Sequence, residues 1–337
     1  MKGSLKSCYQ TQLKIKTLYA VGIIFVIVST AFGIAVGSTA LSLAELFDGL
    51  DTVSGRILLY VRLPRALGSL VCGMALSLSG AVIQAVLVNK LAGPSIIGVN
   101  SGAGLAVAIS AALGIYGGFR LSLIAFIGAF VATMLLNFGV QKWKMGRGSV
   151  VLVGVALNCL FNALTDVVTT LLPDIRIITG DFKIGELQGV TYSKLIPASV
   201  VVTVSLVILM TLRNELGVLS LGEDNARGLG MNTSRMRCVF LILSALLAGS
   251  AVSIAGLVSF VGLIVPHAVR RVSGNHPRHL LPLCALYGGG FVCLCDTLSR
   301  VLFSPYEIPV GIIMAFLGVP FFILLLVRGR RSDYAGD

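Results

Sequence analysis

The chain has 337 residues, of which 56% are apolar and only 12% are charged, with a net charge of +12 and a mean hydropathy of +0.96. About a quarter of the residues of an average soluble domain are charged. The composition therefore excludes a soluble domain and indicates an integral membrane protein, with the lipid bilayer as its surroundings and no nucleic acid among its partners.

Ten apolar segments follow one another along the chain, separated by charges, prolines and glycine clusters. They cover 18–36, 66–88, 96–115, 121–141, 150–171, 195–212, 238–255, 259–271, 280–302 and 308–327. The eighth is too short to cross a bilayer alone, so we expect the chain to break or re-enter around 256–262. Such a break requires protein or a water-filled cavity to satisfy the backbone. The sequence predicts an all-α polytopic membrane protein, with a tail over 1–17, one transmembrane domain over 18–327 and a tail over 328–337.

The distribution of basic residues predicts the orientation. No small-residue cleavage site follows the first span, so it reads as a retained helix rather than a signal peptide. Placing both termini in the cytoplasm puts most of the 26 Lys and Arg residues on that side, as the positive-inside rule requires. Arg62, Arg65 and Arg300 fall instead at the outer ends of spans. They either snorkel to the interface or dock an acidic partner outside, and the residues alone leave both open.

Two stretches of the chain resemble each other. "GMALSLSGAVIQ" from Gly73 and "GSAVSIAGLVSF" from Gly249 each contain two glycines seven residues apart, and a proline follows each. By the span count the first runs inward and the second outward. This pattern indicates an inverted-topology repeat, which is common in transporters.

Polar side chains also occur within the spans. Asn158, Asn162 and Asp166 are spaced four apart and form one stripe on the fifth span. The stripe lines a translocation pathway or makes hydrogen bonds between helices. Asp296 and Arg300 are four apart as well, so they can pair on one helix.

Several catalytic and metal-binding patterns are absent from the sequence. There is no C-x-x-C pair, no pair of histidines at i, i+4, no H-E-x-x-H and no G-x-S-x-G. We therefore expect no metal site, no cofactor and no enzymatic activity in this chain. There is also no G-x-x-x-x-G-K-[ST] phosphate-binding loop, so a motor driven by ATP would be another polypeptide.

The stretch "SLGEDNARGLGMNT", 220–233, is polar and lies between two long apolar runs. Ser220 and Glu223 form the pattern of a capping box, and Asp224 adds negative charge to the first turn. Gly228 and Gly230 are stop signals. The pattern predicts a small capped helix on the cytoplasmic side.

The chain resembles the FecCD-type permease subunits of type II ABC importers, which import iron–siderophore complexes, haem and cobalamin. The motifs that carry the resemblance are "RLPRALGSLVCGMALSLSGAVIQ", "LAGPSIIGVNSGAG", "LGEDNARGLGMN", "SFVGLIVPHAVRR" and "EIPVGIIMAFLGVPFF". The resemblance implies the type II importer fold of ten membrane helices and a dimer with the pathway between two permease subunits, identical or different. It also implies two separate ATPase subunits that use ATP, and an extracytoplasmic substrate-binding protein.

The same resemblance implies roles for particular residues. The segment 221–231 would contain the coupling helix seated in the ATPase, with polar contacts from Glu223, Asp224 and Arg227 and a packing side from Leu221, Ala226 and Leu229. Its members are Leu221, Gly222, Glu223, Asp224, Ala226, Arg227, Gly228, Leu229 and Gly230. Arg62, Arg65 and Arg300 would receive the binding protein, and Asn89, Leu91, Gly148 and Ser149 would form the inner gate. Similar proteins usually have proline where this chain has Lys90, so we expect a less rigid first gate turn.

The resulting hypothesis is the permease subunit of an ATP-driven importer in a bacterial cytoplasmic membrane, carrying an iron(III)–siderophore type chelate. Haem or a corrinoid is the alternative cargo. A secondary transporter using Asp166 is the main rival, and a polytopic membrane enzyme or a purely structural membrane protein ranks below it.

Overall fold

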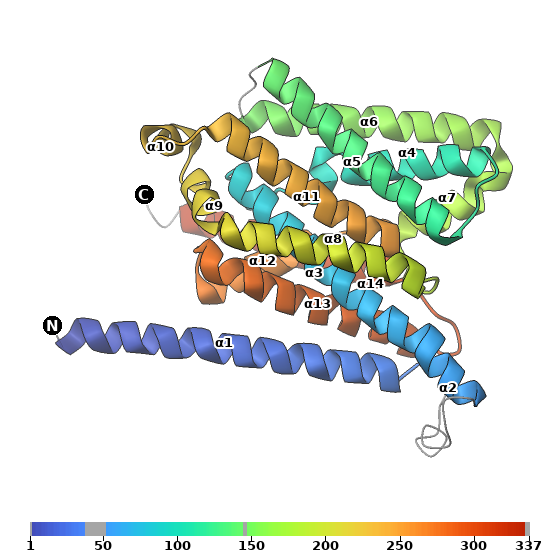
Figure 1. Ribbon diagram of the computed structural model, residues 1–337, viewed down its shortest axis with the longest axis horizontal. Coiled ribbons are helices and arrows are strands. Elements are labelled where there is room, and N and C mark those ends of the chain that lie inside the picture. Colours follow the sequence, from blue (N-terminus) through green and yellow to red (C-terminus); the bar gives the residue numbers. More distant parts are fainter. Residues whose placement is uncertain (1, 38–51, 144–146, 334–337) are drawn as a thin grey trace.

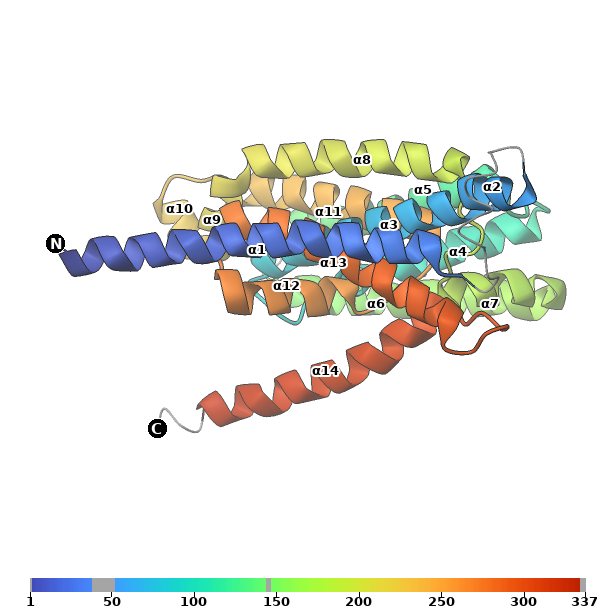
Figure 2. The same ribbon diagram turned by 90° about the horizontal axis from the view of Figure 1, so that it is seen from below.

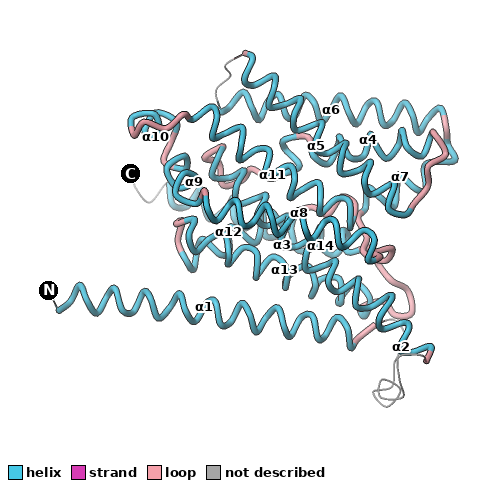
Figure 3. The backbone as a smooth tube through the Cα atoms, viewed as in Figure 1, coloured by secondary structure: helices cyan, strands magenta, loops and turns pink. Residues whose placement is uncertain are grey.

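The computed structural model describes residues 2–37, 52–143 and 147–333, all of which belong to helices or to the turns between them (Figure 3). The helices run in the order α1(Lys2–Ala35), α2(Val53–Ile57), the π-helix η1(Leu58–Arg62), α3(Leu63–Val86), the 3-10 helix η2(Pro94–Ile97), α4(Val99–Ala112), α5(Gly118–Lys142), α6(Arg147–Leu171), the 3-10 helix η3(Pro173–Ile175), α7(Arg176–Ile184), α8(Tyr192–Thr211), α9(Arg213–Ser220), α10(Glu223–Gly228), α11(Thr233–Ala255), α12(Val261–Ser273), α13(Pro277–Val301) and α14(Val310–Asp333).

The predicted spans all correspond to helices. Within the described residues, seven helices are long and apolar enough to cross a membrane, and two shorter apolar ones lie at Val99–Ala112 and Val310–Leu324. The eighth predicted span is α12, which has only 13 residues. Both predicted tails contain helix, because α1 extends back to Lys2 and α14 continues to Asp333. The division into two tails and one transmembrane domain stays a prediction. The last four residues of the C-terminal tail, 334–337, lie outside the described residues.

The central helix is α3, which packs against α11, α12 and α13. Glycines allow these helices to approach closely. A Cβ at Gly73 would lie 2.1 Å from the carbonyl oxygen of Gly288 in α13, and one at Gly80 would lie 2.0 Å from that of Gly262 in α12. Small residues permit such backbone contact between membrane helices. In the most apolar stretch of the span that contains α3, 83% of the residues are accordingly buried, against 17% in that of α1.

The predicted interruption near 256–262 is present. Gly256 ends α11 with φ +66°, and Phe260 precedes α12 with φ +67°. Neighbouring backbone satisfies the broken segment, since the N–H of Leu257 donates to the carbonyl of Phe182 in α7 at 3.0 Å. Protein backbone thus satisfies part of the break, as non-helical backbone at membrane depth requires, and Val258 within it is buried whereas Ser259 is exposed.

The helices α3 and α11 lie side by side and run in opposite directions, as the inverted repeat predicts (Figure 1). The hydroxyls of Ser79 and Ser244 join them at 2.7 Å. Each helix is followed by a proline, at the start of η2 and inside α12.

The two ends of the bundle differ. The start of α1, the short helices α9 and α10 and the end of α14 lie at one end, which we call the N-terminal end (Figure 1). The helices α2 and α7 lie at the opposite end. Figure 2 shows α14 diverging from the rest of the bundle as it runs toward the N-terminal end.

Candidate functional site

The predicted capped helix exists as α10, a helix of six residues at the N-terminal end (Figure 1). It stands between α9 and α11, and a sharp turn at Gly222, with φ +119°, sets it off from α9. This φ lies in the region that glycine favours. The sequence thus places α10 outside the apolar bundle on two short connections.

The end of α10 is a Schellman motif. The N–H of Met231 donates to the carbonyl of Ala226 at 3.1 Å, and that of Gly230 donates to Arg227 at 2.9 Å. Gly230 has φ +81°, as this motif requires. The stop predicted at Gly230 is confirmed, whereas Gly228 is the last helical residue.

The predicted capping box is wrong. Ser220 is the last residue of α9, and its hydroxyl donates to the carbonyl of Gly217 at 2.7 Å. Gly222 is the N-cap of α10 and provides no side chain. The Ser-x-x-Glu pattern does not form a capping box here, because α9 extends to Ser220, the residue expected to be the N-cap.

Glu223 binds α10 to α11. Its Oε1 accepts from Arg227 Nη2 at 3.1 Å and from the hydroxyl of Thr233 at 3.3 Å. The same oxygen lies 3.9 Å from Nη1 of Arg237, whose side chain is only 8% exposed. Glu223 thus holds α10 in place from within the chain.

The outward face of α10 is different in character. Leu221 and Leu229 are 61% and 68% exposed, whereas Ala226 is fully buried against its own chain. Asp224 and Arg227 are exposed as well. Two apolar and two charged side chains therefore face outward on a rigid, doubly anchored turn.

The first predicted gate turn follows α3. The side-chain oxygen of Asn89 accepts from the N–H of Leu91 at 2.9 Å, and the carbonyl of Asn89 accepts from Ala92 at 3.1 Å. An Asx turn of this kind fixes the backbone without proline. Asn89 therefore fixes the turn that contains Lys90. The lower rigidity expected of a turn without proline stays a prediction.

The second predicted gate segment, Gly148 and Ser149, lies in the first turn of α6. Gly148 is exposed, and a Cβ there would have no neighbour within 4 Å. The gate roles of Asn89, Leu91, Gly148 and Ser149 stay predictions.

The polar stripe on α6 divides. Asn158 accepts from the hydroxyl of Ser101 at 2.5 Å and donates to the carbonyl of Ser95 at 2.9 Å, so it joins α6 to its neighbours. Asn162 is exposed. The side chain of Asp166 is 70% exposed and lies 3.6 Å from Nζ of Lys183 in α7. Hydrogen bonds between helices thus account for Asn158, whereas Asn162 and Asp166 face outward.

Three arginines expected at the outer surface are buried at the opposite end of the bundle. Arg62, Arg65 and Arg300 are 4%, 6% and 3% exposed. Arg65 donates to both oxygens of Asp296 at 3.1 Å and to Glu307 at 2.7 Å. The predicted pair of Asp296 and Arg300 is present at 3.5 Å.

Two of these arginines, Arg62 and Arg300, cap the end of α1. Arg62 donates to the carbonyls of Ile34 and Ala35 at 3.1 and 2.8 Å, and Arg300 donates to Gly33 at 2.9 Å. Cations at a helix C-terminus satisfy its last carbonyls and its dipole. In this structure the three guanidinium groups are bound inside the chain. The docking role stays a prediction.

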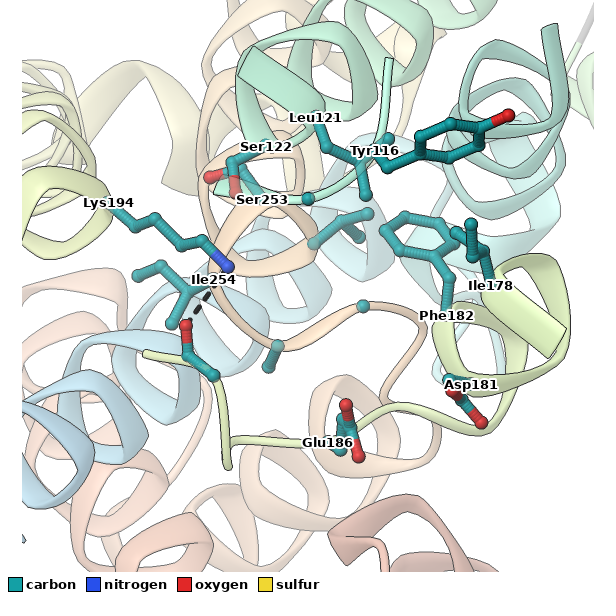
Figure 4. A pocket seen from close by; sticks show the side chains of 15 residues that line it. Tyr116, Leu121, Ser122, Ile178, Asp181, Phe182, Glu186, Lys194, Ser253 and Ile254 are labelled. Carbon is teal, nitrogen blue, oxygen red and sulfur yellow. Dashed lines mark hydrogen bonds between the residues drawn. The ribbon is translucent and has the colours of Figure 1, made fainter. Parts of the chain in front are cut away.

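A hollow of about 360 Å³ lies at the opposite end, between the start of α5, α7 and the end of α11 (Figure 4). Asp181 and Glu186 border it on one side and Lys194 on the other, and Lys194 donates to the carbonyl of Gly189 at 3.0 Å. Burial, and secondarily the charge of Asp181, raises the pKa of Glu186.

No motif in the sequence pointed to these hollow-lining residues. The available signal was the short polar run "GDFKIGELQGVTYSK", 180–194, in which acidic and basic residues alternate between two apolar spans.

Comparison with known proteins decides the family. The model of the FecCD transport family matches residues 23–328. The chain belongs to the FecCD transport family. Members of this family are transport permeases rather than enzymes, in agreement with the catalytic patterns absent from the sequence.

Characterised relatives of this FecCD chain are similar along most of its length. It is 33% identical to the hemin transport system permease protein HmuU of Yersinia pestis, covering 92% of this chain and 95% of that one. It is 32% identical to the iron(3+)-hydroxamate import system permease protein FhuG of Bacillus subtilis, covering 94% and 98%.

A solved metal-chelate type ABC transporter in an inward-facing conformation superposes with a TM-score of 0.82 at 27% identity, over 93% of this chain and 99% of that one. The FecCD chain is therefore a multi-pass membrane permease with the type II ABC importer fold.

Proposed function

We propose that the chain is the membrane-spanning subunit of an ATP-driven importer that moves an iron(III)–siderophore type chelate. The observation that carries this proposal is the family match over 23–328 together with α10, a rigid helix with an exposed apolar and charged face at the N-terminal end. The chain has no phosphate-binding loop, so the ATPase is a separate subunit. In this proposal the chain moves the cargo without making or breaking any covalent bond.

The face of α10 supports docking of that ATPase. Leu221 and Leu229 supply exposed apolar surface, and Asp224 and Arg227 supply polar contacts beside it. Because Glu223 ties α10 to α11 through Thr233 and Arg237, movement of the docked partner passes directly to a membrane helix. The N-terminal end is then the cytoplasmic end, which agrees with the positive-inside rule.

A second permease subunit accounts for two apolar faces that this chain does not cover. On α6, Leu152 and Leu171 are 71% and 74% exposed, and on α14 Phe316 is 76% exposed. The exposed Asn162 and Asp166 lie on α6 as well. A pathway between two such subunits would have these polar groups at its wall.

The cargo follows from the relatives. FhuG is named for iron(3+)-hydroxamate import, whereas HmuU is named for hemin transport at nearly the same identity. A ferric chelate is thus the first candidate and haem the second. A binding protein outside the membrane would deliver either one at the opposite end of the bundle.

Transport by the purified system tests the proposal. The full chain is reconstituted in liposomes with its ATPase and binding protein, and uptake of a ferric hydroxamate and of hemin is measured with and without ATP. We expect ATP-dependent uptake of the hydroxamate. Uptake driven by a proton gradient without the ATPase would contradict the proposal, and ATP-dependent uptake of hemin alone would replace the first cargo by the second.

A further inference from the structure

A long apolar groove lies on the outside of the bundle, between α1 and α12. Both helices pack on α13, which forms the floor. The groove holds about 400 Å³ and is lined by Leu18, Phe25, Ile264, Val265, Ala268, Val269, Val272, Ser273, Leu283, Tyr287 and Phe291. Only Ser273 and Tyr287 among these carry a polar side-chain group.

The walls of the groove are well defined. The rings of Phe25 and Tyr287 stack with centroids 6.1 Å apart, and the hydroxyl of Tyr287 donates to the carbonyl of Leu18 at 3.0 Å. A Cβ at Gly290 would lie 2.6 Å from the ring of Phe25, so this glycine makes room for that wall. The hydroxyl of Ser273 is engaged with the carbonyl of Val269 at 3.0 Å. Both hydroxyl hydrogens of the lining side chains are therefore used in bonds within the chain.

On α12 the lining residues form a single face. Ile264, Ala268 and Val272 are spaced four apart, a periodicity that aligns side chains along one side of a helix. From Ile264 to Val272 this stripe extends for about 12 Å at the rise of an α-helix. The groove therefore has the length and the apolar character of a hydrocarbon chain lying along the helix.

Basic residues surround the groove where it reaches the N-terminal end. Lys14 and Lys16 on α1, Arg271 at the end of α12 and Arg278 at the start of α13 are all exposed. We call these four residues the basic collar. The three helices lie together, because the hydroxyl of Tyr19 in α1 lies 3.4 Å from Nδ1 of His279 in α13, and α12 also packs against α13.

Acidic residues are absent from the sequence around the collar. No Asp or Glu occurs between residues 1 and 44 or between 225 and 295. The collar thus has positive charge without acidic partners along its own segments. Basic pockets between membrane helices at a membrane surface are suited to anionic lipid head groups.

We propose that this groove binds an anionic phospholipid, with one acyl chain along α12 and the phosphate at the basic collar. The apolar walls suit a hydrocarbon chain, and the collar suits a negative head group. Because the lining residues Ala268 and Val272 are themselves exposed, Val272 by 46%, the groove is open on its outer side and a lipid reaches it directly from the bilayer. The proposal does not depend on the cargo or on the ATPase.

Native mass spectrometry of the full chain in detergent tests the proposal. The chain is mixed with phosphatidylglycerol or phosphatidylcholine of the same acyl chains, and retained lipid is counted. We expect preferential retention of phosphatidylglycerol. The double change Arg271→Gln and Arg278→Gln should reduce that preference about 25-fold, since each basic side chain near an anionic surface contributes roughly fivefold.

Two further variants separate the acyl chain from the head group. Ala268→Trp fills the groove and should abolish retention of phosphatidylglycerol, whereas Val204→Trp, on the exposed face of α8, should not. Arg56→Gln with Arg120→Gln, at the opposite end, is the matched charge control. Equal retention of the two lipids, no retention of either, or equal loss in the control variants would overturn the proposal. Unchanged melting temperatures verify that the variants fold.

Discussion

Asp296 accepts hydrogen bonds from Arg65 at 3.0 and 3.1 Å and lies 3.5 Å from Arg300, and all three side chains are buried. Glu307, just before α14, adds a second carboxylate to Arg65. Together with the capping of α1, these pairs join α1, α3, α13 and the start of α14 at one end of the bundle. At this scale the sequence predicted the pair on α13 from its spacing. It did not predict the pairing of Arg65 with Asp296, because their partnership spans 231 residues.

Removing the shared carboxylate should therefore destabilise the protein strongly. We predict that Asp296→Asn costs roughly 3–5 kcal/mol, because breaking a buried ion pair leaves an uncompensated charge. Asp166→Asn is the matched control: it breaks a pair that is 70% and 43% exposed, so we expect about 0–1 kcal/mol. Thermal unfolding of both variants in detergent measures the difference. Equal stability of the two would show that the network contributes little.

The pH dependence of stability has a predicted source at Glu186. Its pKa is raised from its ordinary value of 4.5, mainly by burial and then by Asp181. The folded state therefore binds this proton more tightly than the unfolded state. The corresponding stability is present below pH 4.5 and is lost as the pH rises through the raised pKa. We predict that Glu186→Gln removes this loss, measured as melting temperature against pH. An unchanged profile would contradict the assignment.

At the scale of elements, the long apolar runs predicted every membrane helix, because burial of apolar surface in lipid requires length and little else. The short helices were harder to predict. No pattern in the sequence predicted α9, whose last residue is Ser220, so Ser220 cannot serve as the N-cap of α10. Short helices depend on packing against neighbours rather than on their own sequence. The glycine stop at Gly230 was predictable because it rests on local backbone geometry alone.

That geometry gives a matched pair of glycine variants. We predict that Gly230→Ala, at φ +81°, costs about 1–2 kcal/mol locally, because a Cβ is strained in that region. It should loosen α10 and lower transport per ATP hydrolysed in the reconstituted system. Gly228→Ala, inside α10 with no neighbour within 4 Å of its Cβ, should leave coupling intact. Identical coupling ratios in both variants would contradict a role for the rigid end of α10.

At the scale of the whole molecule, the structure is that of a subunit built to contact others. It has α10 at one end, the arginine network at the other, and the exposed faces of α6 and α14 between them. The span count and the charge bias predicted which residues lie at each end. They did not predict which charges are buried, because burial of Arg62, Arg65 and Arg300 depends on how α1, α3 and α13 meet. The glycine spacing predicted the antiparallel pair of α3 and α11. The hollow near Glu186 could not be predicted, because it forms only where α5, α7 and α11 meet.

The central claim is that α10 docks a separate ATPase, and co-purification tests it most directly. The full chain is expressed with the other subunits of its system, solubilised and captured by a tag, and the captured ATPase activity is measured. The account predicts that a phosphate-binding-loop ATPase co-purifies and that Leu221→Glu with Leu229→Glu abolishes its recovery. Trp143→Glu, 63% exposed at the end of α5, should not affect it. A chain that purifies without an ATPase, or an ATPase retained by the double variant, would contradict the account.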